Sequence, residues 1–134
     1  MSTDRETALE AGWRALESLN ALKNELDKAR NWGIVDFLGG KKLTTFMKYS
    51  KLSNASDLAL TASRDLEVFQ REAQEVLPLT DLKPEVNWLM AYVDFFHDGF
   101  LINYLVQSKI NEARDKVDQA MESVTRLISA IDGS

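Results

Sequence analysis

The residues most suited to chemistry lie in the segment DFFHD, which contains Asp94, His97 and Asp98. Their spacing places two carboxylates and an imidazole on one face of a helix, where they can bind a metal ion or exchange protons. A di-metal bundle needs a second Glu-x-x-His motif, which a chain with one histidine lacks. A single metal site, with Asp36 as a further ligand, is one hypothesis. The other is that these side chains satisfy loop amides or a wet helix interface.

A second group of candidates lies in residues 31–51, NWGIVDFLGGKKLTTFMKYSK, which carry four lysines against one aspartate. Exposed amides at a helix start, a glycine pair that admits a ligand to the backbone, and neighbouring lysines can together hold a phosphate or a carboxylate. The glycine and lysine spacing departs from the Walker pattern, which excludes an NTPase loop. The alternative is a turn with solvated lysines. The candidate ligand- or anion-binding residues are Trp32, Asp36, Gly39, Gly40, Lys41 and Lys42.

The elements that position these residues follow from the spacing of apolar side chains. Apolar residues recur in steps of three and four in three segments, as in helices that pack at a shallow angle. The first seam includes Trp13, which is therefore expected in the core. Helices are predicted over about 4–30, 52–77 and 85–131. The fold class is an all-α antiparallel helical bundle with long coiled-coil-like helices, in a single domain of residues 1–134.

Residues that break helices set the predicted boundaries. Asn31 and Gly33 are of types that end helices, and Gly39–Gly40 form a second break. A short crossover helix is therefore predicted over about 41–50. Pro84 is well placed as the first residue of the third long helix.

The third predicted helix is longer than the other two. Unbroken, residues 85–131 would span about 70 Å, against about 40 Å for each of the others. Either the helix bends or breaks near 98–99, or it continues and its surplus length meets a partner chain. Gly99 costs up to about 1 kcal/mol in a helix interior, but the apolar repeat passes through it without a slip. We favour a long helix, kinked near 98–99, whose exposed seam is covered by self-association.

Asn103 falls on this seam, where a polar side chain commonly fixes register or partner number. A side chain directed to solvent is the alternative. The aromatic residues between 88 and 104 suit a core, a dimer interface or an apolar cavity. The candidate interface or register residues are Tyr92, Phe96, Gly99, Asn103 and Tyr104.

Composition and charge exclude several classes of protein. A net charge of −5 argues against a nucleic-acid-binding protein, because phosphate backbones attract clustered Lys and Arg. The apolar window 88–106 is about as long as a bilayer span, but Asp94 and Asp98 disfavour insertion, so no transmembrane segment is predicted. The first residues do not read as a secretory signal, which indicates a cytoplasmic protein. No cofactor is predicted.

Two blocks of this sequence resemble a group of uncharacterised, mostly Gram-positive bacterial helical proteins. One block is NWGIVDFLGGKKLTTFMKYSKLSNA, with its Trp-Gly, Asp, Gly-Gly and Ser-Lys; the other is DFFHDGFLINYLVQSKINEA, with its Val-Gln-x-Lys-Ile. The group has Asp, Trp and Gly where this chain has Asn103, Tyr104 and Lys41. The resemblance implies a helical fold and two linked motifs, with Asp36 close to Asp94 or Asp98, and no activity.

The leading functional hypothesis is a non-enzymatic cytoplasmic helical protein that acts through self-association, with a dimer favoured, and through binding another protein by the aromatic, glycine-containing part of the third predicted helix. The alternative is a small-ligand, anion or metal-binding protein, with enzymatic activity left open, whose site lies between residues 32–41 and 94–98. A third hypothesis is reversible attachment to a membrane surface through the lysines of residues 41–51 together with Phe46 and Met47.

Overall fold

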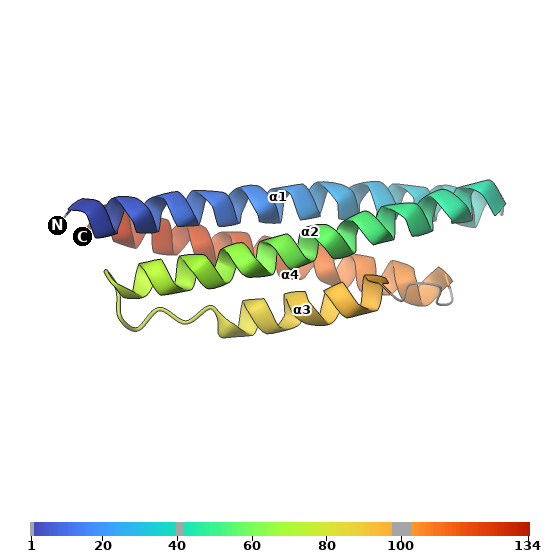
Figure 1. The fold of residues 1–134 in the computed structure, drawn as a ribbon. Helices are drawn as coiled ribbons and strands as arrows, with labels where there is room; N and C mark the ends of the chain where they lie inside the picture. The colour runs from blue at the N-terminus through green and yellow to red at the C-terminus, as the bar shows by residue number, and fades with distance from the viewer. Residues whose placement is uncertain (1, 40–41, 98–102) are drawn as a thin grey trace.

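The computed structural model describes the backbone of residues 2–39, 42–97 and 103–134, and the side chains of residues 4–30, 54–97 and 108–134. Within these ranges the chain forms an all-α bundle, which confirms the predicted fold class (Figure 1). The helices are α1 (Ser2–Gly39), α2 (Lys42–Gln74), α3 (Lys83–His97) and α4 (Asn103–Asp132).

Each helix runs antiparallel to its neighbour along the chain (Figure 1). The most extensive packing joins α1 to α2, followed by α1 to α4 and α2 to α3, and the packing of α3 against α4 is much weaker than these three. Polar pairs fix the alignment at the surface: Ser18 donates a hydrogen bond to Asp65 of α2, and Lys23 pairs with Asp118 of α4 at 2.7 Å. The face between α3 and α4 is therefore the loosest side of the bundle.

The core is built from the apolar seams of the four helices. On α2 the fully buried positions are those that the steps of three and four predict: Ala55, Ala59, Ala62, Leu66, Phe69 and Ala73. On α4 the same spacing buries Ile110, Ala113, Val117, Ala120 and Val124. Small alanines allow the helix axes to approach closely, and continuous apolar seams supply the main favourable free energy of folding.

Gly12 marks a close approach of three helices. A Cβ atom built at this position would lie 2.7 Å from Cγ1 of Ile128 on α4 and 3.0 Å from Cε1 of Phe69 on α2. Both neighbouring side chains are buried. Glycine is present because no side chain fits where α1, α2 and α4 meet.

The first crossover differs from the prediction. α1 does not end near Asn31 and Gly33 but continues to Gly39, and α2 begins at Lys42 and runs without a break to Gln74. The separate crossover helix predicted over 41–50 is therefore wrong, because those residues form the first turns of α2. A glycine inside a helix costs only about 1 kcal/mol relative to alanine, which is too little to end a long helix. The second predicted break, at Gly39–Gly40, agrees with the end of α1; Gly40 lies outside the described residues.

The predicted continuous helix over 85–131 is also wrong. α3 ends at His97, and α4 runs back in the opposite direction from Asn103 (Figure 1). In an unbroken helix, residues 95 and 109 would lie about 20 Å apart along the axis. Instead, Nζ of Lys109 lies 5.9 Å from the ring centroid of Phe95. The alternative of a break near 98–99 agrees with this arrangement, although residues 98–102 lie outside the described part of the chain.

The connection between α2 and α3 is held against α2 by two glutamines. The backbone N–H of Leu82 donates to Oε1 of Gln70 at 2.5 Å, and Nε2 of Gln74 donates to the carbonyl oxygen of Thr80 at 2.9 Å. Leu82 is buried, whereas the side chain of Leu79 is 97% exposed. Pro84 is the second residue of α3, as the sequence predicts to within one position.

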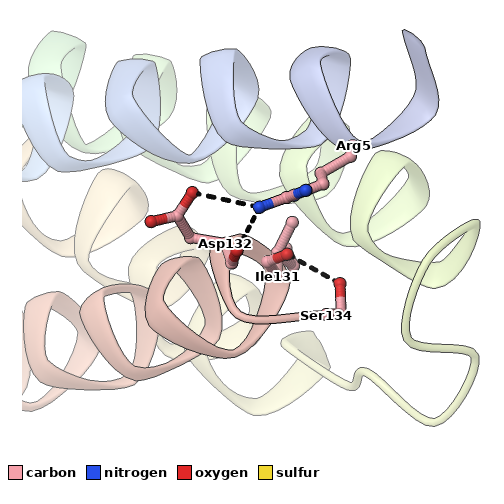
Figure 2. Close-up of polar contacts among 4 residues, drawn as sticks. All are labelled: Arg5, Ile131, Asp132 and Ser134. Atoms are coloured by element: carbon pink, nitrogen blue, oxygen red, sulfur yellow. Dashed lines mark hydrogen bonds and ion pairs between the residues drawn. The ribbon is translucent and has the colours of Figure 1, made fainter. Parts of the chain in front are cut away.

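The two ends of the described chain lie at the same end of the bundle (Figure 1). The guanidinium of Arg5 on α1 donates to the carbonyl oxygen of Asp132 and lies 3.5 Å from its carboxylate (Figure 2). The hydroxyl of Ser134 donates to the carbonyl oxygen of Ile131 at 2.7 Å and so caps the last turn of α4. In the described part of the chain, none of the helices combines the length and the apolar character needed to cross a membrane.

Candidate functional site

The residues of the predicted metal site lie at the end of α3. Asp94 and His97 are both on the solvent side of this helix and exposed, and Asp98 lies outside the described residues. Among the residues that the structure describes, no three His, Cys, Asp or Glu side chains gather closely enough to hold a metal ion. The predicted site, which includes Asp98, stays a prediction.

The predicted ligand site falls on the first crossover. Trp32 and Asp36 lie in the last turns of α1, Gly39 ends that helix and Lys42 begins α2, while Gly40 and Lys41 lie outside the described residues. The side chains of this segment are not described. Figure 1 shows that α3 ends short of the end of the bundle at which α1 gives way to α2. Because the side chains of residues 32–41 are not described, the joint site between residues 32–41 and 94–98 also stays a prediction.

The candidate interface residues divide between the core of the bundle and positions whose side chains are not described. Tyr92 and Phe96 are buried, and their rings stack with centroids 5.7 Å apart and an angle of 16° between the planes. The contacts of these two side chains are thus within the chain. Asn103 and Tyr104 lie in the first turn of α4 with side chains that are not described, and Gly99 lies outside the described residues.

A groove of about 370 Å³ lies between α3 and α4, on the loosest side of the bundle. We call it the aromatic groove; its lining residues are Trp88, Ala91, Tyr92 and Phe95 of α3 and Lys109, Glu112 and Lys116 of α4. The indole of Trp88 meets Tyr92 edge-on, with ring centroids 5.8 Å apart. These aromatic rings lie on one face of α3 because they follow each other in steps of three and four. The groove is thus aromatic on its α3 side and charged on its α4 side.

Glu112 is the central polar group of the aromatic groove. Its carboxylate accepts a hydrogen bond from the hydroxyl of Tyr92 and lies 3.2 Å from Nζ of Lys109. Burial, the charge of Glu112 and this hydrogen bond raise the pKa of Tyr92 well above its ordinary value near 10. Lys109 also lies over the ring of Phe95. Lys116 has no ion-pair partner among the described residues, so the groove retains one uncompensated positive charge.

A second exposed feature lies on α1. The side chain of Trp13 is 60% exposed, which contradicts its predicted place in the core. The stripe of buried positions on α1 passes to one side of it, through Gly12 and Ala15. We call the area around it the Trp13 surface; it comprises the partly buried Leu9 and Leu16, the exposed Trp13, and the exposed charged residues Glu6, Glu10, Arg14 and Glu17.

Sequence reasoning singled out the aromatic side of the groove and missed its charged side. Tyr92 and its neighbouring aromatic residues stood out as a cluster. Lys109, Glu112 and Lys116 appeared only as the polar positions of a charged helix, because the antiparallel pairing of α3 with α4 had not been predicted. The signal that could have found them is their spacing of three and four, which places all three on one face of α4.

No protein-family model, curated protein or solved structure matches this chain.

Proposed function

We propose that this chain is a non-enzymatic helical protein that works by binding a second protein through the Trp13 surface. The observation that supports the proposal is the 60% exposure of Trp13 on a helix whose other large apolar side chains are buried or partly buried in the described range. Tryptophan is among the residue types that contribute most to the free energy of binding at protein interfaces.

The free energy available at this surface is large enough to matter for binding. A fully covered tryptophan side chain removes roughly 150–250 Å² from water, so covering the exposed part of Trp13 removes on the order of 90–150 Å². At about 25 cal/mol per Å², this burial contributes roughly 2–4 kcal/mol before the costs of association. Leu9 and Leu16, four residues before and three after Trp13, extend the apolar contact along the helix.

The charges of the Trp13 surface indicate the kind of partner. Glu6, Glu10 and Glu17 are exposed and lack ion pairs among the described residues, and Arg14 is the one basic side chain among them. An acidic rim around an apolar anchor favours a partner segment that carries Lys or Arg beside an apolar pocket. We therefore infer a partner protein with a basic surface.

Self-association, which the sequence predicts, stays a prediction. Two copies of the Trp13 surface would bring three acidic side chains per chain against each other, and like charges across an interface lower its stability. A homodimer would thus use another face of the bundle. Sedimentation equilibrium of the full chain at low and at high salt measures the oligomeric state.

The proposal is tested by affinity capture from extracts of the source cells, read by quantitative mass spectrometry. The full chain is compared with Trp13→Ala and with the charge reversal Glu10→Lys. The matched control is Val68→Ala, which truncates an exposed apolar side chain on α2. We expect a specific protein to be retained by the wild type and the control and lost by both variants at the Trp13 surface.

Titration calorimetry with the purified captured protein then measures the affinity. Trp13→Ala is expected to weaken binding by about 30-fold, which corresponds to roughly 2 kcal/mol. Binding is expected to weaken as salt rises, because the acidic rim is exposed. A partner that binds Trp13→Ala as tightly as the wild type, with both chains equally folded, would refute the role of this surface.

A further inference from the structure

We propose that the aromatic groove between α3 and α4 is a binding site for a small molecule that combines a planar aromatic body with a single carboxylate. This inference is independent of the Trp13 surface, which lies on α1, whereas the groove lies between α3 and α4, which pack only weakly against each other. The site would give the chain a ligand in addition to a protein partner.

The aromatic half of the ligand follows from the α3 side of the groove. Trp88, Tyr92 and Phe95 line the groove, and Trp88 and Phe95 are partly exposed to it. The exposed rings can stack on, or meet edge-on, an aromatic body inserted between the helices. Ala91 lies on the same side, and its short side chain leaves the space that the body occupies.

The single carboxylate follows from the charges on α4. The charge of Glu112 is compensated within the chain, because the ammonium of Lys109 lies 3.2 Å from its carboxylate. Lys116 is left with no ion pair among the described residues and lines the groove. One free ammonium beside aromatic rings complements one carboxylate, whereas a polyphosphate would need several cations.

The dimensions of the groove fit a small molecule. Its aromatic lining spans residues 88–95 of α3, which is about 10 Å along the helix axis. This length accommodates two fused aromatic rings. A volume of about 370 Å³ also lies in the range of small-molecule sites.

The test uses 2-naphthoate as the probe and its uncharged analogue 2-naphthamide as the matched control ligand. Binding to the full chain is measured by titration calorimetry and by the shifts of backbone amide signals in NMR spectra. We expect 2-naphthoate to bind with a dissociation constant below about 1 mM and to shift amides of residues 88–95 and 109–116. The amide is expected to bind about tenfold more weakly, because it lacks the charge that pairs with Lys116.

Two variants separate the two halves of the proposal. Lys116→Gln removes the free charge and is expected to weaken 2-naphthoate binding by about tenfold without changing binding of the amide. Ala91→Trp fills the groove from an exposed position and is expected to abolish binding of both probes. Lys83→Gln, an exposed lysine at the start of α3, is the control and is expected to bind both probes as the wild type does.

Three results would overturn the inference. The first is no binding of 2-naphthoate at about 1 mM. The second is equal affinity for 2-naphthoate and 2-naphthamide, together with an unchanged affinity of Lys116→Gln for 2-naphthoate. This result would show that the site does not recognise the carboxylate. The third is amide shifts that lie on α1 and α2, which places the probe elsewhere. If Ala91→Trp loses its helical circular dichroism, the Lys116→Gln titration and the position of the shifts decide the question.

Discussion

Replacing Gly12 with alanine is expected to destabilise the bundle, although alanine is the better helix former. The new Cβ would lie 2.7 Å from Cγ1 of Ile128 and 3.0 Å from Cε1 of Phe69, closer than the ordinary contact distance of about 3.5–4.0 Å. Cγ1 of Ile128 is near the backbone of α4, and the ring of Phe69 is fully buried, so neither group can move aside freely.

The magnitude is the balance of two opposing effects. Alanine in place of glycine inside a helix contributes about 1 kcal/mol to stability. Overpacking a well-filled core costs typically about 1–3 kcal/mol. We therefore expect Gly12→Ala to lower the free energy of unfolding by about 1 kcal/mol, because the steric cost exceeds the gain in helix propensity.

The assay is urea unfolding of four chains: the wild type, Gly12→Ala, Ile128→Ala and the double variant. Ile128→Ala removes Cγ1 and Cδ1, the two atoms of Ile128 that the new Cβ would meet, and costs roughly 2–5 kcal/mol by itself. In that background the contact with Cε1 of Phe69 remains, but the ring can shift into the space that Ile128 leaves. Gly12→Ala is therefore expected to stabilise the chain by about 0.5–1 kcal/mol, since helix propensity then dominates. The predicted sign of the Gly12→Ala effect thus reverses between the two backgrounds.

Asn20→Ala, at an exposed position of α1, measures the propensity gain without a steric cost. It is expected to raise stability by a few tenths of a kcal/mol up to about 0.7 kcal/mol. If Gly12→Ala were as stabilising as Asn20→Ala in the wild-type background, the close approach of α1 to α2 and α4 at Gly12 would be incorrect.

Three further predictions concern the polar groups. Above about pH 10, Tyr92 loses its proton in the unfolded chain but keeps it in the folded chain, so the free energy of unfolding of the wild type falls as the pH rises. Tyr92→Phe should lack the contribution of this tyrosine to that decrease. Asp27→Asn, which breaks the partly exposed pair with Arg114, should cost about 0.5 kcal/mol at low salt and close to nothing at about 1 M salt. Gln70→Ala should cost about 1–2 kcal/mol and speed hydrogen exchange at the buried Leu82 amide.

Each of these predictions has an internal control. For Tyr92→Phe, the tyrosines at 49 and 104 remain in both chains, so only the difference between the two pH profiles is read. Identical profiles would contradict the burial of the Tyr92 hydroxyl against Glu112. For Asp27→Asn, a cost that does not change with salt would contradict an electrostatic origin. For Gln70→Ala, an unchanged rate of hydrogen exchange at the Leu82 amide would contradict the hydrogen bond from that amide to the side chain of Gln70.

The seams of the helices were predictable from the sequence because they depend on local spacing. The apolar buried positions of α2, and those of α4 from Ile110 to Val124, follow directly from apolar steps of three and four. Near the end of α4 the predicted seam passes through Leu127, whereas the structure buries Ile128 and leaves Leu127 partly buried. The change of direction between α3 and α4 was not predictable from the same pattern, since the seams of both helices face one core. The apolar repeat of the sequence therefore passes from α3 to α4 without a slip, as it would along a single helix.

The outward position of Trp13 shows a second limit of pattern reasoning. Trp13 lies one residue from Gly12, and either position fits a step of three or four from its neighbours. The structure buries the glycine, because the close approach of α2 and α4 leaves no room for a side chain there. Which of two adjacent residues faces the core thus depended on tertiary packing. The same holds for the aromatic groove, whose charged side is set by the pairing of α3 with α4.

The pairing of Arg5 with Asp132 has a mechanical consequence. α1 begins and α4 ends at this pair, and the two helices are antiparallel (Figure 2). A force that pulls the two ends of the described chain apart therefore acts perpendicular to the helix axes. Such a load peels α4 from α1 one turn at a time, beginning at Arg5 and Asp132 and passing next to Lys23 and Asp118. A force applied instead along the axis, between opposite ends of two helices, would have to shear a whole seam at once. The bundle is therefore weakest in the direction in which a tether at both ends would pull it.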